Sequence, residues 1–328
     1  IHPNDHGHFI IARSILEALD APGIDLLPDS SKPTPDSNLT RAMPLILERH
    51  GLISAAWREH VGHSKPKKED VPPLPEAQRQ ADSMEVEIRS ILSKPERQVR
   101  RMSQPVGDHQ LEYLLQTPSG EKPDAGWPLL LFLHGYGECG DKIEAILKHG
   151  PPKLISQFEV LQGAVIVSPQ CPKKSWWRTE ALKALVDEVI QQRGDIDPKR
   201  LYITGLSMGG YGTWSFVSRY PSYFAAAIPI CGGGDPFNLP ANRPPIKSGI
   251  ANEFLPQGLA QAKDLPIWAF HGARDSSVPI KETQALVDLL KQAGSDHIKF
   301  TTYPEARHVQ TWQNAYSNPE VWQWLFSQ

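Results

Sequence analysis

The chain has 328 residues, enough for one large domain or two of ordinary size and for a large core without metals or disulfides. Its formal net charge of −3 lacks the basic excess that binding to a phosphate backbone needs, so we expect no nucleic-acid partner. No apolar run reaches the roughly 18 residues of a membrane span, so none is predicted.

Residues 1–103 are predicted to form helices joined by proline-rich connectors. Apolar residues recur at helical spacing over residues 9–19, 45–60 and 76–92, and prolines, serines and charged residues fill the segments between them. This part of the chain has no run of apolar strands. It is therefore not expected to be a complete domain.

A different pattern begins near residue 104, where apolar strand-like runs alternate with amphipathic helical stretches. The alternation is typical of an α/β domain, here residues 104–328, with a mainly parallel central sheet flanked by helices. The predicted strands are residues 111–116, 129–133, 165–167, 200–204, 225–230, 267–270 and 299–303. The predicted helices are residues 179–192, 211–220, 281–293 and 319–326.

The motif Gly205-Leu206-Ser207-Met208-Gly209 lies between a predicted strand and a predicted helix. A strained strand-to-helix turn of this kind lifts a serine hydroxyl out of the sheet, and its glycines leave room for the tight turn. The following helix directs its first backbone N–H groups toward the same place, which favours a developing oxyanion. The motif therefore predicts Ser207 as a nucleophile.

A glycine-rich loop, residues 134–138, directly follows the wholly apolar strand at residues 129–133. In a sheet of this topology the loop supplies one backbone N–H of an oxyanion hole, and the residue after the nucleophile supplies the other. We predict Tyr136 and Met208 for these two positions. His134 is expected to brace the loop rather than to transfer protons.

An acidic residue should follow a late strand, where its carboxylate can orient a histidine and stabilise the imidazolium form. Asp275 follows the predicted strand at residues 267–270, and Asp235 follows the strand at residues 225–230. We predict Asp275 as the acid and keep Asp235 as its competitor.

The base should follow the last strand, and His308 does so. The chain order Ser207, Asp275, His308 is that of an α/β-hydrolase. His271, close to the acid, and His297, at the end of a predicted helix, are weaker candidates. We therefore predict a catalytic triad of Ser207, His308 and Asp275.

Residues 104–328 resemble the α/β-hydrolase superfamily, and within it the compact bacterial esterases described as predicted peptidases, polyhydroxybutyrate-depolymerase-like or feruloyl-esterase-like enzymes. The resemblance implies a serine carboxylesterase that needs no metal and no organic cofactor. One departure is Cys139, where the family pattern leads us to expect an arginine. The matching segments are residues 133–138, 168–171, 205–212, 229–235, 270–275, 312–316 and 322–325.

The first eight residues resemble the last catalytic block of the SGNH, or GDSL, hydrolases, in which an Asp stands three residues before the catalytic His. That His corresponds to His2, and the position of the Asp falls before Ile1. The resemblance implies that residues 1–103 are the C-terminal remnant of an SGNH-like hydrolase and a linker. His2 would have no nucleophile to activate, so it is not counted as catalytic.

The expected activity is hydrolysis of short-acyl or aromatic-acyl esters, with a small molecule or a plant or algal polysaccharide as the carrier. Trp176, Trp177 and Trp312 are candidates for stacking on a sugar or an aromatic acyl group. Action on polysaccharide would favour a secreted or periplasmic location, although the compartment stays open. The alternatives are a serine peptidase and a non-catalytic binding module on a hydrolase scaffold.

The three cysteines, Cys139, Cys171 and Cys231, do not have the spacing of metal ligands, and no metal site is predicted. Unpaired thiols are the favoured interpretation, and a disulfide between Cys171 and Cys231 is left open.

Overall fold

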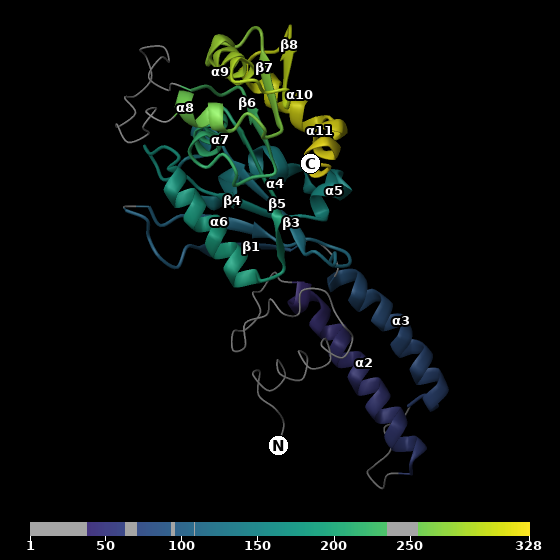
Figure 1. Ribbon diagram of the computed structural model, residues 1–328. Helices are drawn as coiled ribbons and strands as arrows, with labels where there is room; N and C mark the ends of the chain where they lie inside the picture. Colours follow the sequence, from purple (N-terminus) through teal and green to yellow (C-terminus); the bar gives the residue numbers. More distant parts are fainter. Residues whose placement is uncertain (1–37, 63–70, 93–95, 108, 235–254) are drawn as a thin grey trace. The chain divides into compact units, whose positions relative to one another are not determined.

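The protein was analysed as a computed structural model (Figure 1), which describes residues 38–62, 71–92, 96–107, 109–234 and 255–328. The chain divides into two compact units, residues 1–96 with 119–122, and residues 97–118 with 123–328. The predicted helix at residues 9–19 and the SGNH-like block with His2 lie outside the described residues, so both stay predictions.

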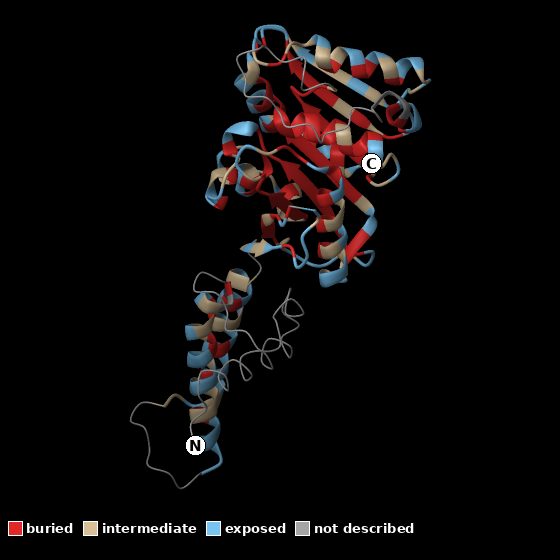
Figure 2. Cartoon of the chain, turned by 90° about the vertical axis from the view of Figure 1, so that its left-hand side faces the viewer, coloured by how far each residue is buried: buried red, intermediate tan, exposed pale blue. Residues whose placement is uncertain are grey.

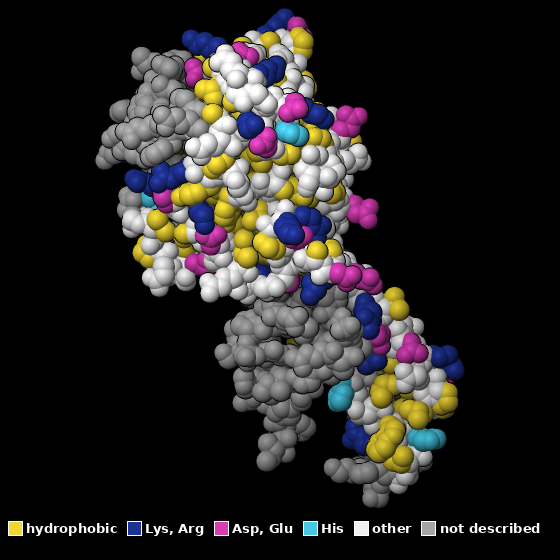
Figure 3. Space-filling model, in the orientation of Figure 1, with side chains coloured by type: hydrophobic (Ala, Val, Ile, Leu, Met, Phe, Trp, Pro, Cys, Tyr) yellow, Lys and Arg dark blue, Asp and Glu magenta, His cyan; other side chains and the backbone are white. Residues whose placement is uncertain are grey.

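The described part of the first unit is a pair of packed helices, α2 (Asn38–His60) and α3 (Leu74–Leu92). Ala42, Ile46 and Ile88 are fully buried between them, and an ion pair of 2.9 Å joins Arg49 to Glu85. Large apolar side chains such as Trp57 remain exposed, and hydrophobic surface is visible on this pair in Figure 3. The described residues of this unit include no strand.

The second unit is built on an eight-stranded sheet with the order β1-β2-β4-β3-β5-β6-β7-β8. The pairs β1–β2 and β2–β4 are antiparallel, and every other neighbouring pair is parallel. The strands are β1 (Arg97–Arg101), β2 (Glu112–Gln116), β3 (Trp127–Leu133), β4 (Val165–Pro169), β5 (Ile196–Leu206), β6 (Ala226–Ile230), β7 (Ile267–Gly272) and β8 (Ile298–Tyr303).

Helices cover both faces of this sheet because its central strands are apolar on both sides. Leu129, Leu131 and Leu133 of β3 pack in one core cluster with α6 (Thr179–Arg193), α7 (Met208–Arg219), α8 (Leu255–Gln261) and α9 (Lys281–Gln292). Leu130 and Phe132 pack in a second cluster with α10 (His308–Ser317) and α11 (Pro319–Phe326). Figure 2 shows the buried strands between the two helical layers. The architecture is that of an α/β-hydrolase, as predicted.

Short helices lie in the connection between β3 and β4. They are η2 (Tyr136–Glu138), η3 (Ile143–Lys148), α4 (Gly150–Leu154), η4 (Ile155–Gln157) and α5 (Glu159–Gln162). None of them was predicted, because segments of three to six residues are too short to show a helical period.

The sheet begins at Arg97, before the predicted boundary at residue 104. Strand β1 has three arginines and an exposed Val99, so it lacks the apolar run that marks the interior strands. Charged edge strands of this kind protect a sheet from pairing with other chains.

The order of the strands reverses at β3, since β4 lies on one side of it and β5 on the other. The loops that leave the carboxyl ends of β3 and β5 therefore lie next to each other. Ligand sites of open α/β sheets form at such a switch point.

On the face shown in Figure 3, Lys and Arg side chains are interspersed with Asp and Glu, without a broad field of one sign. Within the described ranges, no helix combines the length and the apolar character that crossing a membrane requires.

Candidate active site

Ser207 stands alone between β5 and α7, which begins at the next residue. Its backbone has φ 55° and ψ −116°, a left-handed conformation that costs a side-chain-bearing residue of order 1–3 kcal/mol. The N–H of Ser207 donates to the carbonyl of Ile230 on β6, which holds the turn in place. This is the geometry of a nucleophile elbow.

Glycines let three backbone segments meet at this elbow. A Cβ on Gly209 would lie 1.9 Å from the carbonyl oxygen of Leu133, and a Cβ on Gly205 would lie 2.3 Å from that of Gly209. A Cβ on Gly210 would lie 2.5 Å from the carbonyl oxygen of Ile230. Because the obstructing atoms are backbone, no side chain can be accommodated without moving the strands.

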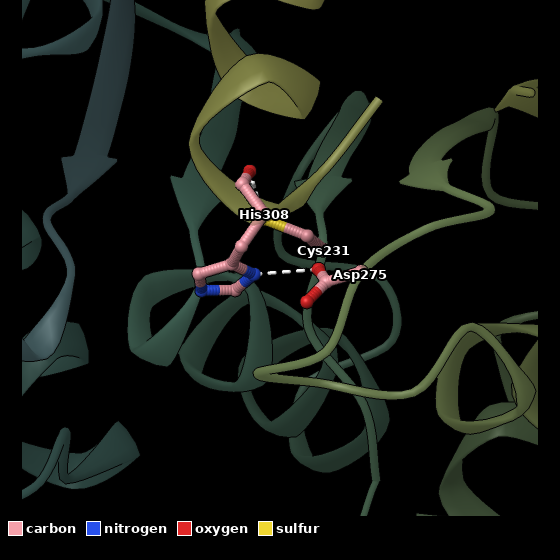
Figure 4. A group of neighbouring side chains, drawn as sticks. All are labelled: Cys231, Asp275 and His308. Carbon is pink, nitrogen blue, oxygen red and sulfur yellow. Dashed lines mark hydrogen bonds and ion pairs between the residues drawn. The ribbon is translucent and has the colours of Figure 1, made fainter. Parts of the chain in front are cut away.

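His308 lies between Ser207 and Asp275. Its Nε2 is 2.8 Å from Ser207 Oγ, and its Nδ1 is 2.5 Å from Asp275 Oδ2 (Figure 4). The carboxylate has no proton to give, so Nδ1 carries the ring proton and Nε2 can accept the serine hydroxyl proton. His308 is the first residue of α10, not part of a loop, and its ring also meets the edge of Trp312.

The Asp275 carboxylate is inaccessible to solvent and is held by four donors. Oδ1 accepts from the N–H groups of Ser277 and Val278 at 2.8 and 2.9 Å. Oδ2 faces His308 and also His271, whose Nε2 is 3.3 Å away. Burial opposes ionisation, but the hydrogen bonds from His271 and His308 prevail and hold the pKa of Asp275 below its ordinary value.

His134 braces the loop after β3, as expected from the sequence. Its Nε2 accepts the N–H of Cys171 at 3.0 Å, so the ring proton is on Nδ1, which donates to the Gly135 carbonyl at 2.6 Å. Burial lowers the pKa of His134 to about 4, which keeps the ring neutral. Trp177 donates to the His134 carbonyl at 3.2 Å, which fixes the same segment from its other side.

The loop after β3 lies directly against Ser207. A Cβ on Gly135 would lie 3.6 Å from Ser207 Cβ and 3.2 Å from Glu138 Oε2. Among the described hydrogen bonds, the N–H groups of Tyr136 and Met208 have no acceptor. These are the two backbone donors that the sequence predicts for an oxyanion hole.

Glu138, the last residue of this loop, and His149 form a wall that was not predicted. Glu138 is buried, which raises the pKa of its carboxyl group, and Oε1 lies 3.8 Å from His149 Nε2. The His149 ring meets the edge of Trp312, which in turn meets His308. The prediction missed both residues because Glu138 lies in a helix of three residues and His149 lies between two short helices, positions that give no periodic signal.

The three tryptophans predicted to bind substrate are all buried, with at most 9% of each side chain exposed. Trp177 is only 2% exposed, and its indole N–H donates to the His134 carbonyl, so its role in binding substrate stays a prediction. Trp176 packs against Tyr211 of α7. Trp312 lies against His308 and so remains next to the proposed reacting groups.

One competing candidate, His297, lies away from this arrangement. His297 precedes β8 and is therefore at the amino edge of the parallel strands, opposite Ser207. Asp235 lies outside the described residues. All three cysteines are described and carry free thiols, so Cys171 and Cys231 are not joined.

Cys231, Asp275 and His308 place one potential ligand atom each within 4.8 Å of the others (Figure 4). His308 and Asp275 already bind each other through Nδ1 and Oδ2. Burial, and then the charge of Asp275, raise the pKa of Cys231 well above its ordinary value, so the sulfur stays a neutral thiol. Metals bind the thiolate, so the donor set fits a metal poorly.

Comparisons with known proteins point to ester hydrolysis. Residues 170–321 match the dienelactone hydrolase family. A probable carboxylesterase SOBER1-like from Arabidopsis thaliana is 30% identical over 207 residues, which cover 55% of this chain and 71% of that protein. A solved thermostable esterase is 31% identical with a TM-score of 0.59, and the match covers 71% of this chain and 63% of that one. This chain thus spans less than two thirds of the solved esterase.

A solved ferulic acid esterase has a TM-score of 0.55 over 71% of this chain and 98% of its own, but at 16% identity it shows only the shared fold. Fold, elbow and relatives together define a serine hydrolase of the α/β-hydrolase class. The chain belongs to the carboxylesterases of that class.

Proposed function

We propose that the chain hydrolyses carboxylic esters through an acyl-enzyme on Ser207, with His308 as general base and acid and Asp275 as its orienting partner. The observation that carries the proposal is the continuous contact from Ser207 Oγ through the His308 ring to Asp275 Oδ2, with steps of 2.8 and 2.5 Å. Nucleophile, base and orienting acid are thereby within hydrogen-bonding reach of one another.

In the first half of the reaction, Ser207 Oγ attacks the ester carbonyl carbon while His308 Nε2 takes the hydroxyl proton. The carbonyl oxygen becomes an oxyanion that accepts from the N–H groups of Met208 and Tyr136. As the carbon–oxygen bond to the alcohol breaks, His308 returns the proton to the leaving alkoxide. The alcohol departs and the acyl group remains on Ser207.

In the second half, water replaces the alcohol. His308 takes one of its protons while the oxygen attacks the acyl carbon, and the same two N–H groups bind the new oxyanion. Breaking the bond to Ser207 Oγ returns the proton to the serine and releases the carboxylic acid. Each cycle thus consumes one water and restores the starting protonation of all three residues.

We infer short-acyl or aromatic-acyl esters as the substrate class. Trp312 beside His308 and His149 beside Trp312 give the site an aromatic wall that suits a flat acyl group. A ferulic acid esterase shares the fold. A polysaccharide as the carrier of the ester follows from the resemblance to an SGNH hydrolase, and with it the secreted or periplasmic location.

The test measures turnover of p-nitrophenyl acetate, butyrate and ferulate by the whole chain and by Ser207→Ala. Loss of roughly a thousandfold or more in kcat on substitution is expected. Folding of the variant is checked by circular dichroism, and Ser215→Ala on α7 serves as a control away from the elbow.

Two further measurements distinguish an esterase from a serine peptidase and from a non-catalytic binding module. Faster cleavage of a matched anilide than of the ester would indicate a peptidase. Absence of both turnover and labelling of Ser207 by a fluorophosphonate would indicate a binding module and overturn the proposal.

A further inference from the structure

We propose that His271 is a positioning residue of the triad. It holds the Asp275 carboxylate in the orientation in which Oδ2 faces His308. The inference rests on the proposed function of Asp275 and His308. It starts from an arrangement in which one carboxylate oxygen, Asp275 Oδ2, faces two imidazole rings at once.

His271 is the fifth residue of β7 and is completely buried. Its Nε2 lies 2.9 Å from the carbonyl oxygen of Val278 and 3.3 Å from Asp275 Oδ2. Both neighbours of Nε2 are acceptors, so this nitrogen carries a proton in every state compatible with the structure. His271 therefore donates toward the carboxylate and cannot act as a base there.

The other side of the ring is anchored as firmly. Nδ1 lies 2.8 Å from Thr283 Oγ1 on α9, and the Thr283 hydroxyl donates to the carbonyl of Gly232, also at 2.8 Å. The Thr283 hydroxyl thus links the ring to the segment after β6. The ring is thus held between the segment after β6, the start of α9 and the acid loop.

This anchoring determines where Asp275 points. Two backbone N–H groups hold Oδ1 in place. The carboxylate can then still pivot about Oδ1, and this motion changes the position of Oδ2. His308 is the group that must move protons and cannot by itself fix Oδ2. His271, immobile on the opposite side, supplies the second donor that keeps Oδ2 in place when His308 changes its protonation.

The His271 N–H also reduces the negative electrostatic potential that Asp275 produces at His308. Without it, Asp275 would stabilise the imidazolium form of His308 more strongly. Loss of one ordinary hydrogen bond corresponds to a shift of about 0.7 pH unit. Loss of the donor should therefore move the acidic limb of the kcat/KM profile to higher pH by about that amount.

The experiment compares His271→Asn and His271→Gln in the whole chain with p-nitrophenyl acetate. The Gln amide nitrogen can occupy the place of Nε2 and donate to Val278 and Asp275, whereas the shorter Asn reaches only the place of Nδ1. We expect kcat of H271N to fall about tenfold below that of H271Q, with similar KM. The shift of the acidic limb should appear in H271N only.

Thr283→Val separates positioning from general support of the fold. It removes the partner of Nδ1 but leaves Nε2 facing Asp275, so a lower melting temperature with kcat close to wild type is expected. Equal losses of kcat in T283V, H271N and H271Q, with unshifted pH profiles, would overturn the inference and assign His271 to packing alone.

Should H271N not fold, ¹⁵N NMR of histidine-labelled wild type and H271Q decides, because an unprotonated Nε2 at His271 is incompatible with the inference. The proposed function fails separately, when wild type shows no turnover that depends on Ser207.

Discussion

The Nδ1 atom of His308 lies 2.5 Å from Oδ2 of Asp275, although the two residues belong to α10 and to the loop after β7. The parallel arrangement of β7 and β8 brings them together, since both strands end at the same edge of the sheet. Of the two carboxylate oxygens, only Oδ2 is free for His308, because backbone N–H groups hold Oδ1.

This arrangement predicts the effect of Asp275→Asn. The amide oxygen must take the place of Oδ1 to accept from Ser277 and Val278, so the NH₂ group faces His308. His308 Nδ1 then has to accept, its proton moves to Nε2, and Nε2 cannot take the Ser207 proton. We expect kcat for p-nitrophenyl acetate to fall roughly a thousandfold or more. Asp264→Asn, on a side chain that is 78% exposed, is the control and should leave kcat unchanged.

Gly209→Ala should damage both stability and activity. Its Cβ would lie 1.9 Å from the Leu133 carbonyl oxygen, and neither β3 nor α7 can yield without moving the elbow. A loss of about 1–3 kcal/mol in the free energy of unfolding is expected, together with most of the kcat. Gly163→Ala is the matched control, because its Cβ would meet nothing closer than 3.8 Å and its φ of −84° suits alanine. Equal behaviour of the two variants in urea unfolding would contradict this account.

His134 should make the protein sensitive to acid. The pKa of His134 is about 4 in the folded protein, whereas the ordinary value for histidine, expected in the unfolded chain, is 6.5. The unfolded chain therefore binds more protons between these two pH values. The contribution of neutral His134 to the free energy of unfolding is complete above pH 6.5 and is lost as the pH falls toward 4. The total loss is at most about 3 kcal/mol. His134→Gln keeps an acceptor for Cys171 and removes the titration, so its unfolding free energy should depend less on pH in this window. Chemical unfolding at pH 7.5 and 5 measures the difference, with the half-exposed His297→Gln as control.

Cys139 should be the thiol through which alkylation inhibits the enzyme. It is partly exposed, while Cys171 and Cys231 are buried. Its Sγ lies 3.9 Å from Met208 Sδ, so a maleimide adduct would displace the residue that follows the nucleophile. We expect N-ethylmaleimide to abolish most of the turnover of p-nitrophenyl acetate and to leave Cys139→Ala active. Inhibition of both proteins alike would place the reactive thiol elsewhere.

The interior strands were predictable because burial on both faces of a parallel sheet selects continuous apolar runs, as in Leu129–Leu133. The chain order of Ser207, Asp275 and His308 likewise follows from the order in which the strands reach the carboxyl edge. Strand β1 was missed because an edge strand tolerates arginines at Arg97, Arg100 and Arg101.

The contacts of individual side chains could not be predicted from the sequence in the same way. Trp177 was expected at a substrate surface, yet its indole N–H finds its partner in the carbonyl of His134, which is 43 residues earlier in the chain. His271 was considered only as an alternative base, because its contact with Thr283 arises from the packing of α9 on the sheet. Such pairings depend on tertiary contacts that leave no periodic pattern in the sequence.

The proposed reacting side chains come from residues 207–308, whereas the wall of Glu138 and His149 comes from the connection between β3 and β4. Substitutions in that connection can accumulate without touching the residues that transfer protons. Relatives with this fold can therefore diverge in the esters they select while retaining one acyl-transfer chemistry, and exchanging residues 138–163 between them would change selectivity alone.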